Sequence, residues 1–431
     1  MTYAETIDYL FTRLPMFSRI GAAAYKKDLT NTIRLCEALG NPHHQFKSIH
    51  IAGTNGKGSV SHMMAAILQT GGYKTGLYTS PHLKDFRERI KINGEMCSEE
   101  FVIRFTKKIQ PLIEEIEPSF FEITVAMAFS WFAEQQVDIA VIEVGLGGRL
   151  DSTNIIQPEL SVITNIGMDH MNMLGNTLTA IAGEKAGIMK AGIPCVIGEV
   201  LPETQQVFEN TSGKVSSPLI YAQRERSILD WNYAHHQLQV TTLHQTTKES
   251  DTFSIDLPGM YQLKNILTVL EAADQLAHSG WNTGIAIIQK ALSQVKKLTG
   301  LHGRWEIIRT NPAVILDVGH NEDGIKAINQ QLSHVTYKNL HIIIGMVKDK
   351  DIDAVLAILP KHAIYHFTQA QIPRALDASS LQEQAAQFGL IGDRFDDVNT
   401  ALKATIKNAD PEDLILVCGS VFLVGEVNTS F

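Results

Sequence analysis

Short apolar runs alternate with longer stretches of helical periodicity along the first 200 residues. The apolar runs predict buried strands at Ser48–Ala52, Lys74–Tyr78, Asp138–Glu143, Leu160–Ile166 and Ile193–Ile197. Apolar positions spaced three and four residues apart predict helices near residues 4–14, 26–40, 60–70, 98–117 and 122–134. Strands that alternate with helices predict a mostly parallel sheet with right-handed crossovers.

The pattern changes near residue 215. Gln237–Leu243 and Thr252–Asp256 alternate polar and apolar residues, which predicts an antiparallel excursion at the edge of the sheet. A helix is expected from about Tyr261 to His278, and Val295–Gly300 is the expected linker. A second α/β run starts near Trp305. Its expected strands, which form a separate doubly wound sheet, are Ala313–Val318, Leu340–Gly345, Ala363–Thr368 and Leu414–Cys418.

These elements predict an α/β protein of two domains. Residues 1–298 form an N-terminal domain of P-loop type, a mostly parallel sheet flanked by helices. Residues 299–431 form a smaller, Rossmann-like α/β domain. The length of 431 residues exceeds that of one ordinary core, and 44% hydrophobic with 19% charged residues is typical of a globular enzyme.

Charge and cysteine content exclude several classes of partner. The net charge of -9 argues against nucleic acid, and no stretch reaches the roughly 18 apolar residues that span a bilayer. The four cysteines form no CxxC pair, and the N-terminus has no signal-peptide pattern. We therefore expect a cytoplasmic protein with reduced thiols, without a nucleic-acid or membrane partner.

The segment Gly53–Ser59 follows the first predicted strand and precedes a helix that we expect to begin at Val60. Free backbone N–H groups and the positive helix end favour phosphate there, and Lys57 adds a full charge. The spacing departs from the Walker pattern, because Gly53 lies four residues before the lysine and Gly58 separates it from Ser59. The alternative is a glycine-rich turn with a solvated lysine.

Polar residues follow three predicted strands at their carboxyl ends, where ligands bind in open α/β sheets. Thr79–Leu83 offers hydroxyl groups. Glu143 needs a positive partner, either a magnesium ion bound to a triphosphate or a salt bridge to Arg149. Asp169 and His170 follow a third strand, and we expect His170 to ligate a metal rather than to serve structure alone.

Three further residues have competing interpretations. Gly183–Gly187 is expected at a helix start, where Lys185 is ordinarily a surface charge and ligates a metal only as a carbamate. In the second half of the chain, Arg304 is expected to neutralise phosphate charge, and Asp317 ends a β-branched strand before a tight turn at Gly319. The alternative for both is an interdomain salt bridge.

Together these segments make the chain resemble the folylpolyglutamate synthase/dihydrofolate synthase family of the Mur ligase superfamily. The matching segments are Leu39–Pro42, Gly53–Ser59, Thr79–Leu83, Phe120–Glu122 with Thr124, Glu143–Asn154, Asp169–His170, Gly183–Gly187, His302–Arg304 and Asp317–Asn321. The resemblance implies that residues 1–298 are the ATP-binding domain and residues 299–431 the glutamate-ligase domain. ATP, bound between them, converts a carboxylate to an acyl phosphate, which the amine of glutamate attacks.

The resemblance also implies roles for individual residues. Lys57, His170 and Lys185 would serve catalysis, with Lys185 carbamylated. Two Mg²⁺ ions would be held by Ser80 and Glu143 and by His170. The residues implied at ATP are Asn55, Gly56, Lys57, Gly58, Ser59, Asn265, Arg304 and Asp317. The residues implied at the pterin are Ser119, Phe120, Phe121, Glu122, Leu150, Asp151 and Ser152.

The expected substrates are small molecules, namely folate or dihydropteroate and L-glutamate, and the expected state is a monomer. One alternative is a muramyl amino-acid ligase, although only 52 residues precede Gly53, too few for the additional domain that such enzymes use to hold a uridine nucleotide. Another alternative is a nucleotide-gated binding protein. A binding protein of that kind would not need Glu143, His170 and Lys185.

Overall fold

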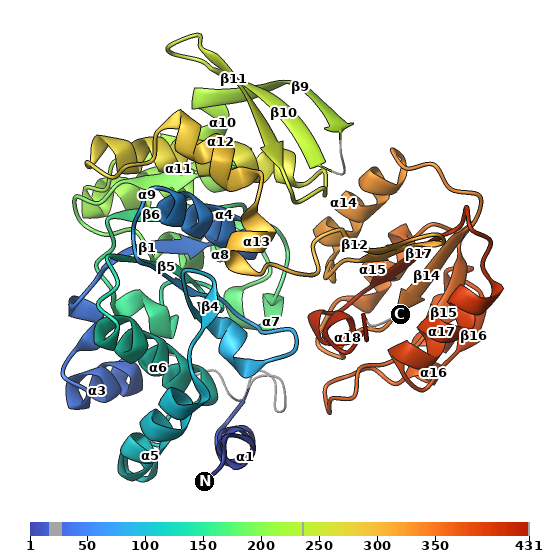
Figure 1. The fold of residues 1–431 in the computed structure, drawn as a ribbon, viewed down its shortest axis with the longest axis horizontal. Helices are drawn as coiled ribbons and strands as arrows, with labels where there is room; N and C mark the ends of the chain where they lie inside the picture. Colours follow the sequence, from blue (N-terminus) through green and yellow to red (C-terminus); the bar gives the residue numbers. More distant parts are fainter. Residues whose placement is uncertain (17–27, 235–236, 430–431) are drawn as a thin grey trace. The chain divides into compact units, whose positions relative to one another are not determined.

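The computed structural model describes residues 1–431 except 17–27, 235–236 and 430–431. By its internal contacts the chain divides into two compact units (Figure 1). Unit 1 comprises Met1–Gly167, Met171–Asp256 and Tyr261–Leu301. Unit 2 comprises Met168–His170, Leu257–Met260 and His302–Phe431. The domain boundary expected at 298/299 stays a prediction.

Unit 1 is built on an eight-stranded sheet in the order β4-β3-β2-β5-β1-β6-β7-β8. The parallel strands are β1 (Lys47–Ala52), β2 (Thr75–Tyr78), β5 (Ile139–Glu143), β6 (Leu160–Ile163), β7 (Cys195–Ile197) and β8 (Leu219–Tyr221). The antiparallel strands β3 (Ile90–Ile92) and β4 (Glu95–Met96) form one edge. β1 and β5 are buried along nearly their whole length, because helices cover both faces of the sheet.

The segments predicted as amphipathic helices in unit 1 are helical, and the unit has further helices that the sequence pattern did not predict. They are α1 (Tyr3–Arg13), α3 (Thr30–Ala38), α4 (Lys57–Thr70), α5 (Glu99–Ile116), α6 (Phe120–Glu134), α7 (Met171–Leu174), α8 (Leu178–Ala186), α9 (Pro202–Val215), α10 (Ala222–Glu225), α11 (Gln262–His278), α12 (Ile285–Leu292) and α13 (Val295–Thr299). Short 3₁₀ turns lie at Pro42–His44, Phe86–Arg89 and Ser152–Ile155. Residues 26–27 of the predicted 26–40 helix lie outside the described residues. α5 and α6 lie on one face of the sheet and α4 and α11 on the other (Figure 1).

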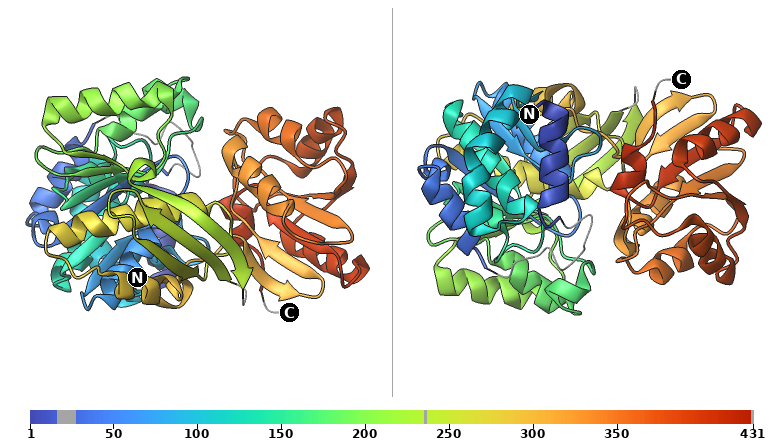
Figure 2. Two further views of the ribbon diagram at one scale, coloured as in Figure 1. Left: turned by 90° about the horizontal axis from the view of Figure 1, so that it is seen from above. Right: turned by 90° about the horizontal axis from the view of Figure 1, so that it is seen from below.

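The antiparallel excursion is a sheet of its own, which corrects the prediction of an addition to the edge of the main sheet. β9 (Arg226–Ala234), β10 (Gln237–His244) and β11 (Ser250–Ile255) pair in the order β11-β10-β9 (yellow-green in Figure 2). Alternation predicts one buried face, and Val240 and Phe253 are buried on it. That face packs on α11 and α12 rather than joining the main ladder.

The expected linker at Val295–Gly300 is also corrected, because most of it is the helix α13 of unit 1. The ammonium of Lys91 donates to the carbonyl of Thr299 at 2.9 Å, and Nδ1 of His62 lies 2.8 Å from the hydroxyl of Thr299. Val295 and Thr299 are fully buried in this helix. The two lysines between them are typical of a solvated linker, which is why the sequence pattern predicted one.

Unit 2 is a six-stranded sheet in the order β12-β13-β17-β14-β15-β16. Its strands are β12 (Glu306–Thr310), β13 (Ala313–Leu316), β14 (Leu340–Ile344), β15 (Ile364–Phe367), β16 (Gly392–Arg394) and β17 (Leu414–Cys418). Its helices are α14 (Glu322–Leu332), α15 (Ile352–Ile358), α16 (Ala378–Gln387), α17 (Val398–Asn408) and α18 (Val421–Gly425). Only β12 runs antiparallel, so the predicted α/β class is confirmed. Among the described residues, no helix is long and apolar enough to cross a membrane.

Candidate active site

The phosphate loop connects β1 to α4, and α4 begins at Lys57 rather than at Val60. Gly56 caps the helix with φ +84°, and Gly53 has φ +151°. A Cβ on Gly53 would lie 1.8 Å from Oγ1 of Thr164, so only glycine fits there. The earlier start brings Lys57 to the positive end of α4, where an anion is favoured.

The side chain of Lys57 folds over its own loop. Its ammonium donates to the carbonyls of Gly53 at 3.0 Å and Thr54 at 3.2 Å. Asn165, which follows β6, bonds to the loop: its side-chain oxygen accepts from the backbone N–H of Asn55 at 2.8 Å. These contacts hold an ammonium group beside a glycine-rich helix start, the combination that binds phosphate.

Residues of α11 also contact the phosphate loop. A Cβ on Gly56 would lie 2.5 Å from Oδ1 of Asn265, a buried residue. Asn265 donates to the amide oxygen of Gln262 at 2.7 Å, and Gln262 donates to the hydroxyl of Ser59 at 3.1 Å. The structure thus brings Asn265 to Gly56 of the phosphate loop, although they are 209 positions apart in sequence.

Ser80 and Glu143 meet at the carboxyl ends of β2 and β5. The backbone N–H of Ser80 donates to Oε2 of Glu143 at 3.1 Å, and Glu143 is buried. Arg149, the alternative partner of Glu143, pairs with Glu184 at 2.7 Å. A carboxylate beside a hydroxyl-bearing residue is an oxygen donor set that suits Mg²⁺ or Mn²⁺.

Lys185 differs from its expected setting in two ways. It lies in the last turn of α8, not at a helix start, and it is buried rather than a surface charge. Its Nζ donates to the carbonyl of Gly53 at 2.9 Å. Burial beside the phosphate loop fits a functional lysine, because a buried ammonium group is costly without a specific role.

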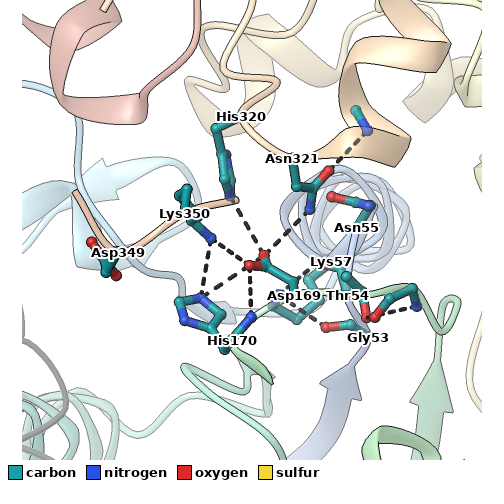
Figure 3. A network of polar contacts seen from close by, with 12 residues as sticks. Gly53, Thr54, Asn55, Lys57, Asp169, His170, His320, Asn321, Asp349 and Lys350 are labelled. Atoms are coloured by element: carbon teal, nitrogen blue, oxygen red, sulfur yellow. Dashed lines mark hydrogen bonds and ion pairs between the residues drawn. The ribbon is translucent and has the colours of Figure 1, made fainter. Parts of the chain in front are cut away.

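Asp169 is the centre of a polar cluster in unit 2 (Figure 3). Its carboxylate accepts from Lys350 Nζ at 2.6 Å and from Asn321 Nδ2 at 3.3 Å, and Nε2 of His320 lies 3.7 Å away. Burial alone would raise the pKa of Asp169, but His320 and the charge of Lys350 outweigh it and lower that pKa. His170 lies beside this cluster with φ +50° and with Nε2 3.5 Å from Lys350 Nζ.

Sequence reasoning missed Lys350. It follows β14, whose carboxyl end is an expected ligand position, in the segment Met346–Asp351. Ligands bind at the carboxyl ends of parallel strands, and this rule, which pointed to Glu143 and Asp169, points to this segment as well.

Arg304 and Asp317 lie in unit 2, at the same end of the antiparallel pair β12–β13. The carboxylate of Asp317 is buried and accepts from the backbone N–H groups of Trp305 at 2.9 Å and Gly319 at 2.8 Å. Arg304 Nη1 donates to the carbonyl of Gly303 at 3.3 Å. Asp317 thus orders the turn that carries Arg304, and the predicted ATP contacts of both residues stay predictions.

The two segments predicted to bind the pterin lie side by side in unit 1. Ser119 and Glu122 form the capping box of α6, with Ser119 N 2.6 Å from Oε2 of Glu122. The ring of Phe121 packs on Gly145, where a Cβ would lie 2.4 Å from it. Gly145 begins the loop that leads to Leu150–Ser152. The contact brings the two segments together.

Phe120 belongs to an aromatic cluster. Its ring centroid lies 5.4 Å from that of Phe11 and 5.9 Å from that of Phe86, and the guanidinium of Arg89 lies 5.4 Å from it. A groove of about 460 Å³ adjoins this cluster. Its lining residues are Tyr3, Ala4, Ile7, Asp8, Phe11, His82, Lys84, Asp85 and Phe86.

Within the described residues, one group of three side chains has the spacing of a metal site: His244, Glu271 and Asp274. Arg226 already pairs with both carboxylates. Nδ1 of His244 accepts backbone N–H groups at 3.2 and 3.3 Å, which leaves the ring proton on Nε2, the nitrogen that faces Asp274. We therefore interpret this group as an ion-pair cluster that ties β9 and β10 to α11.

Two family models match the chain over the regions just described. The Mur ligase middle domain matches residues 51–273, which include the phosphate loop, Glu143 and Lys185. The Mur ligase glutamate ligase domain matches residues 303–421, which include Arg304 and Asp317. The class of protein is thus a Mur ligase.

Curated relatives define the branch. The chain is 31% identical to the folylpolyglutamate synthase of Lacticaseibacillus casei, over 99% of this chain and 98% of that protein. It is 32% identical to the dihydrofolate synthase/folylpolyglutamate synthase of Bacillus subtilis, over 93% of this chain and 94% of that protein. The chain belongs to the folylpolyglutamate synthase/dihydrofolate synthase family of Mur ligases.

Solved structures agree with this assignment. Mycobacterium tuberculosis folylpolyglutamate synthase complexed with ADP is 30% identical, with a TM-score of 0.87 over 98% of this chain and 96% of that chain. Escherichia coli FolC in complex with DHPP and ADP is 28% identical, with a TM-score of 0.83 over 99% and 96%. The bifunctional Yersinia pestis enzyme complexed with AMPPNP and a Mn ion is 27% identical, with a TM-score of 0.83 over 99% and 97%.

Proposed function

We propose that this protein is an ATP-dependent ligase that adds L-glutamate to folates, and that it also adds the first glutamate to dihydropteroate. One observation carries the proposal. In this member of the family, the buried Lys185 and Asn265 lie against a glycine-rich helix start that bears Lys57. The relatives named for both ligations support both substrates.

The chemistry needs charge neutralisation and positioning more than covalent help from the protein. The substrate carboxylate attacks the γ-phosphorus of ATP, and ADP leaves as the acyl phosphate forms. The amine of glutamate then adds to the acyl carbon. Phosphate departs and the amine loses its proton, which leaves the amide. The acyl carbon thus loses phosphate, a good leaving group, where the free acid would have to lose hydroxide, a poor one.

We also propose the residue roles that the family resemblance implies. Asn55–Ser59 and Asn265 hold the ATP phosphates and base, with Lys57 at the β- and γ-phosphates. Ser80 and Glu143 would hold one Mg²⁺, which would neutralise phosphate charge, and His170 would hold a second. Arg304 and Asp317 contribute further ATP contacts, and Ser119–Glu122 with Leu150–Ser152 bind the pterin.

Lys185 is proposed to carry a carbamate. The amine is buried within 2.9 Å of the Gly53 carbonyl, where a carbamate would supply oxygens to a cation that an ammonium group cannot. The four cysteines are free and buried, which supports a reducing compartment, and we propose the cytoplasm. We also propose a monomer that acts on small molecules and not on nucleic acid.

The test is incorporation of labelled L-glutamate with ATP and Mg²⁺, run separately on dihydropteroate and tetrahydrofolate. We expect an amide product and stoichiometric phosphate with both acceptors, and loss of turnover with EDTA that Mg²⁺ or Mn²⁺ restores. Turnover with a muramyl nucleotide but with neither pteroate would overturn the proposal. Phosphate release that ignores all acceptors would favour a nucleotide-gated binding protein instead.

A further inference from the structure

A buried hydrogen-bond relay lies behind the predicted pterin-binding segment, and no role described so far uses it. Nε2 of His50 lies 2.9 Å from the hydroxyl of Thr153. That hydroxyl donates to Oδ1 of Asp151 at 2.5 Å, and the backbone N–H of Thr153 donates to the same oxygen at 3.0 Å. His50 and Thr153 are both fully buried, so water does not compete with these bonds.

The direction of the relay is determined by its proton count. Oδ1 of Asp151 accepts from both the backbone N–H and the hydroxyl of Thr153, so the single proton of that hydroxyl goes to Asp151. His50 must then donate from Nε2, and its Nδ1 makes no hydrogen bond within the described part of the chain. Burial, and secondarily the charge of Lys190, lower the pKa of His50 to about 3, which keeps the ring neutral.

The two ends of the relay lie on a central strand and on a loop. His50 lies in β1, paired with Ile142 of β5 and Ser161 of β6, three residues before Gly53. At the other end, Oδ2 of Asp151 accepts from the backbone N–H of Leu146 at 2.8 Å. The carboxylate therefore joins both ends of the 146–151 loop, and Thr153 with His50 connects that loop to the centre of the sheet.

We propose that His50 and Thr153 are positioning residues for the folate-binding segment: the relay from β1 holds Leu150–Ser152 in the orientation that receives the pterin. This inference rests on the proposed function. Without the Thr153 hydroxyl, the His50 N–H and the Asp151 carboxylate each lose a partner in a dry site, and the loop gains freedom. The expected defect is in acceptor binding, not in ATP binding.

The test compares KM values of Thr153→Val, Thr153→Ser and the wild type. We expect Thr153→Val to raise the KM for tetrahydrofolate or dihydropteroate about tenfold, the size of one lost buried hydrogen bond. The KM for ATP should change less than about twofold. The kcat should persist, because the substitution removes acceptor binding that the ground state and the transition state share. Thr153→Ser, which keeps the hydroxyl, should restore the acceptor KM. His50→Phe should reproduce the Thr153→Val pattern, and it serves as the test if Thr153→Val does not fold.

Thr106→Val is the matched control. Thr106 is fully buried in α5, and its hydroxyl has no hydrogen-bond partner among the described residues. Equal rises in the KM for ATP and for the acceptor, or a Thr153→Ser enzyme no better than Thr153→Val, would overturn the positioning role. A wild-type enzyme without glutamate incorporation would instead refute the proposed function.

Discussion

The side-chain ammonium of Lys185 donates a hydrogen bond to the backbone carbonyl of Gly53 over 2.9 Å, although 132 residues separate them. This bond ties the last turn of α8 to the start of the phosphate loop. Asn165 also bonds to the loop, and the side chain of Asn265 lies against Gly56. A site held in this way is preorganised, because few groups need to move when the nucleotide binds.

Lys57→Ala should lower ATP-dependent glutamate incorporation at least about 100-fold, because the phosphate charge loses its nearest cation. The fold should persist, since the two hydrogen bonds described for the lysine side chain go to carbonyls of its own loop. Circular dichroism and thermal unfolding check the fold. Lys290→Ala, an exposed lysine on α12, is the control and should keep full activity.

Lys185→Ala should also lose activity about 100-fold, because the carbamate proposed there would be absent. Short carboxylates or bicarbonate should restore part of the rate by placing oxygens in the space that the side chain vacates. Activity is measured with and without added acetate in buffers depleted of carbon dioxide. A variant that is fully active without rescue would remove Lys185 from the site.

Gly56→Ala should destabilise the protein by about 1–3 kcal/mol, because φ is +84° and a Cβ would meet Oδ1 of Asn265. Gly213→Ala in α9 is the opposite case. It has open space around the Cβ position and a helical setting, so it should stabilise by about 0.5–1 kcal/mol. Urea denaturation of both variants measures the two changes, and equal effects would contradict the steric argument.

Acid should destabilise unit 2 through His366. Burial, helped by His341, lowers the pKa of His366 to about 4. Between about pH 4 and about pH 6.5 the unfolded chain binds a proton at this residue and the folded chain does not. The contribution of His366 to the unfolding free energy is therefore fully present above about pH 6.5 and falls as the pH drops towards 4. His366→Gln keeps an N–H donor but does not titrate.

Denaturation of the wild type and of His366→Gln at pH 7 and pH 5 measures this effect. The wild type should lose more unfolding free energy between the two pH values than the variant does. The same loss in both proteins would assign the acid sensitivity to other groups.

Local patterns determined most of the architecture. The apolar run that ends in Glu143 could only be a strand buried on both faces, and it is β5. Glycines at positions 53 and 56 before a helix identified the phosphate loop, because few other sequences allow positive φ at a helix start. The motifs that resemble the ligase family pointed to the activity before any contact was known.

Other features depended on which elements pack together. Lys185 looked like a surface charge at a helix start, because helical periodicity does not say which turn of α8 meets the phosphate loop. β9–β11 looked like an addition to the main sheet, because alternation of residues shows that one face is buried but not what covers it.

The sequence by itself determined the succession of elements, the anion-binding loop and the chemistry of the acidic strand ends, since these depend on neighbours within a few residues. Only the tertiary structure decided that Asn265 and Lys185 reach Gly56 and Gly53, that Lys350 holds Asp169, and that His50 reaches Asp151 through Thr153. Those contacts join residues tens to hundreds of positions apart. They follow from strand order and helix packing, which local periodicity does not encode.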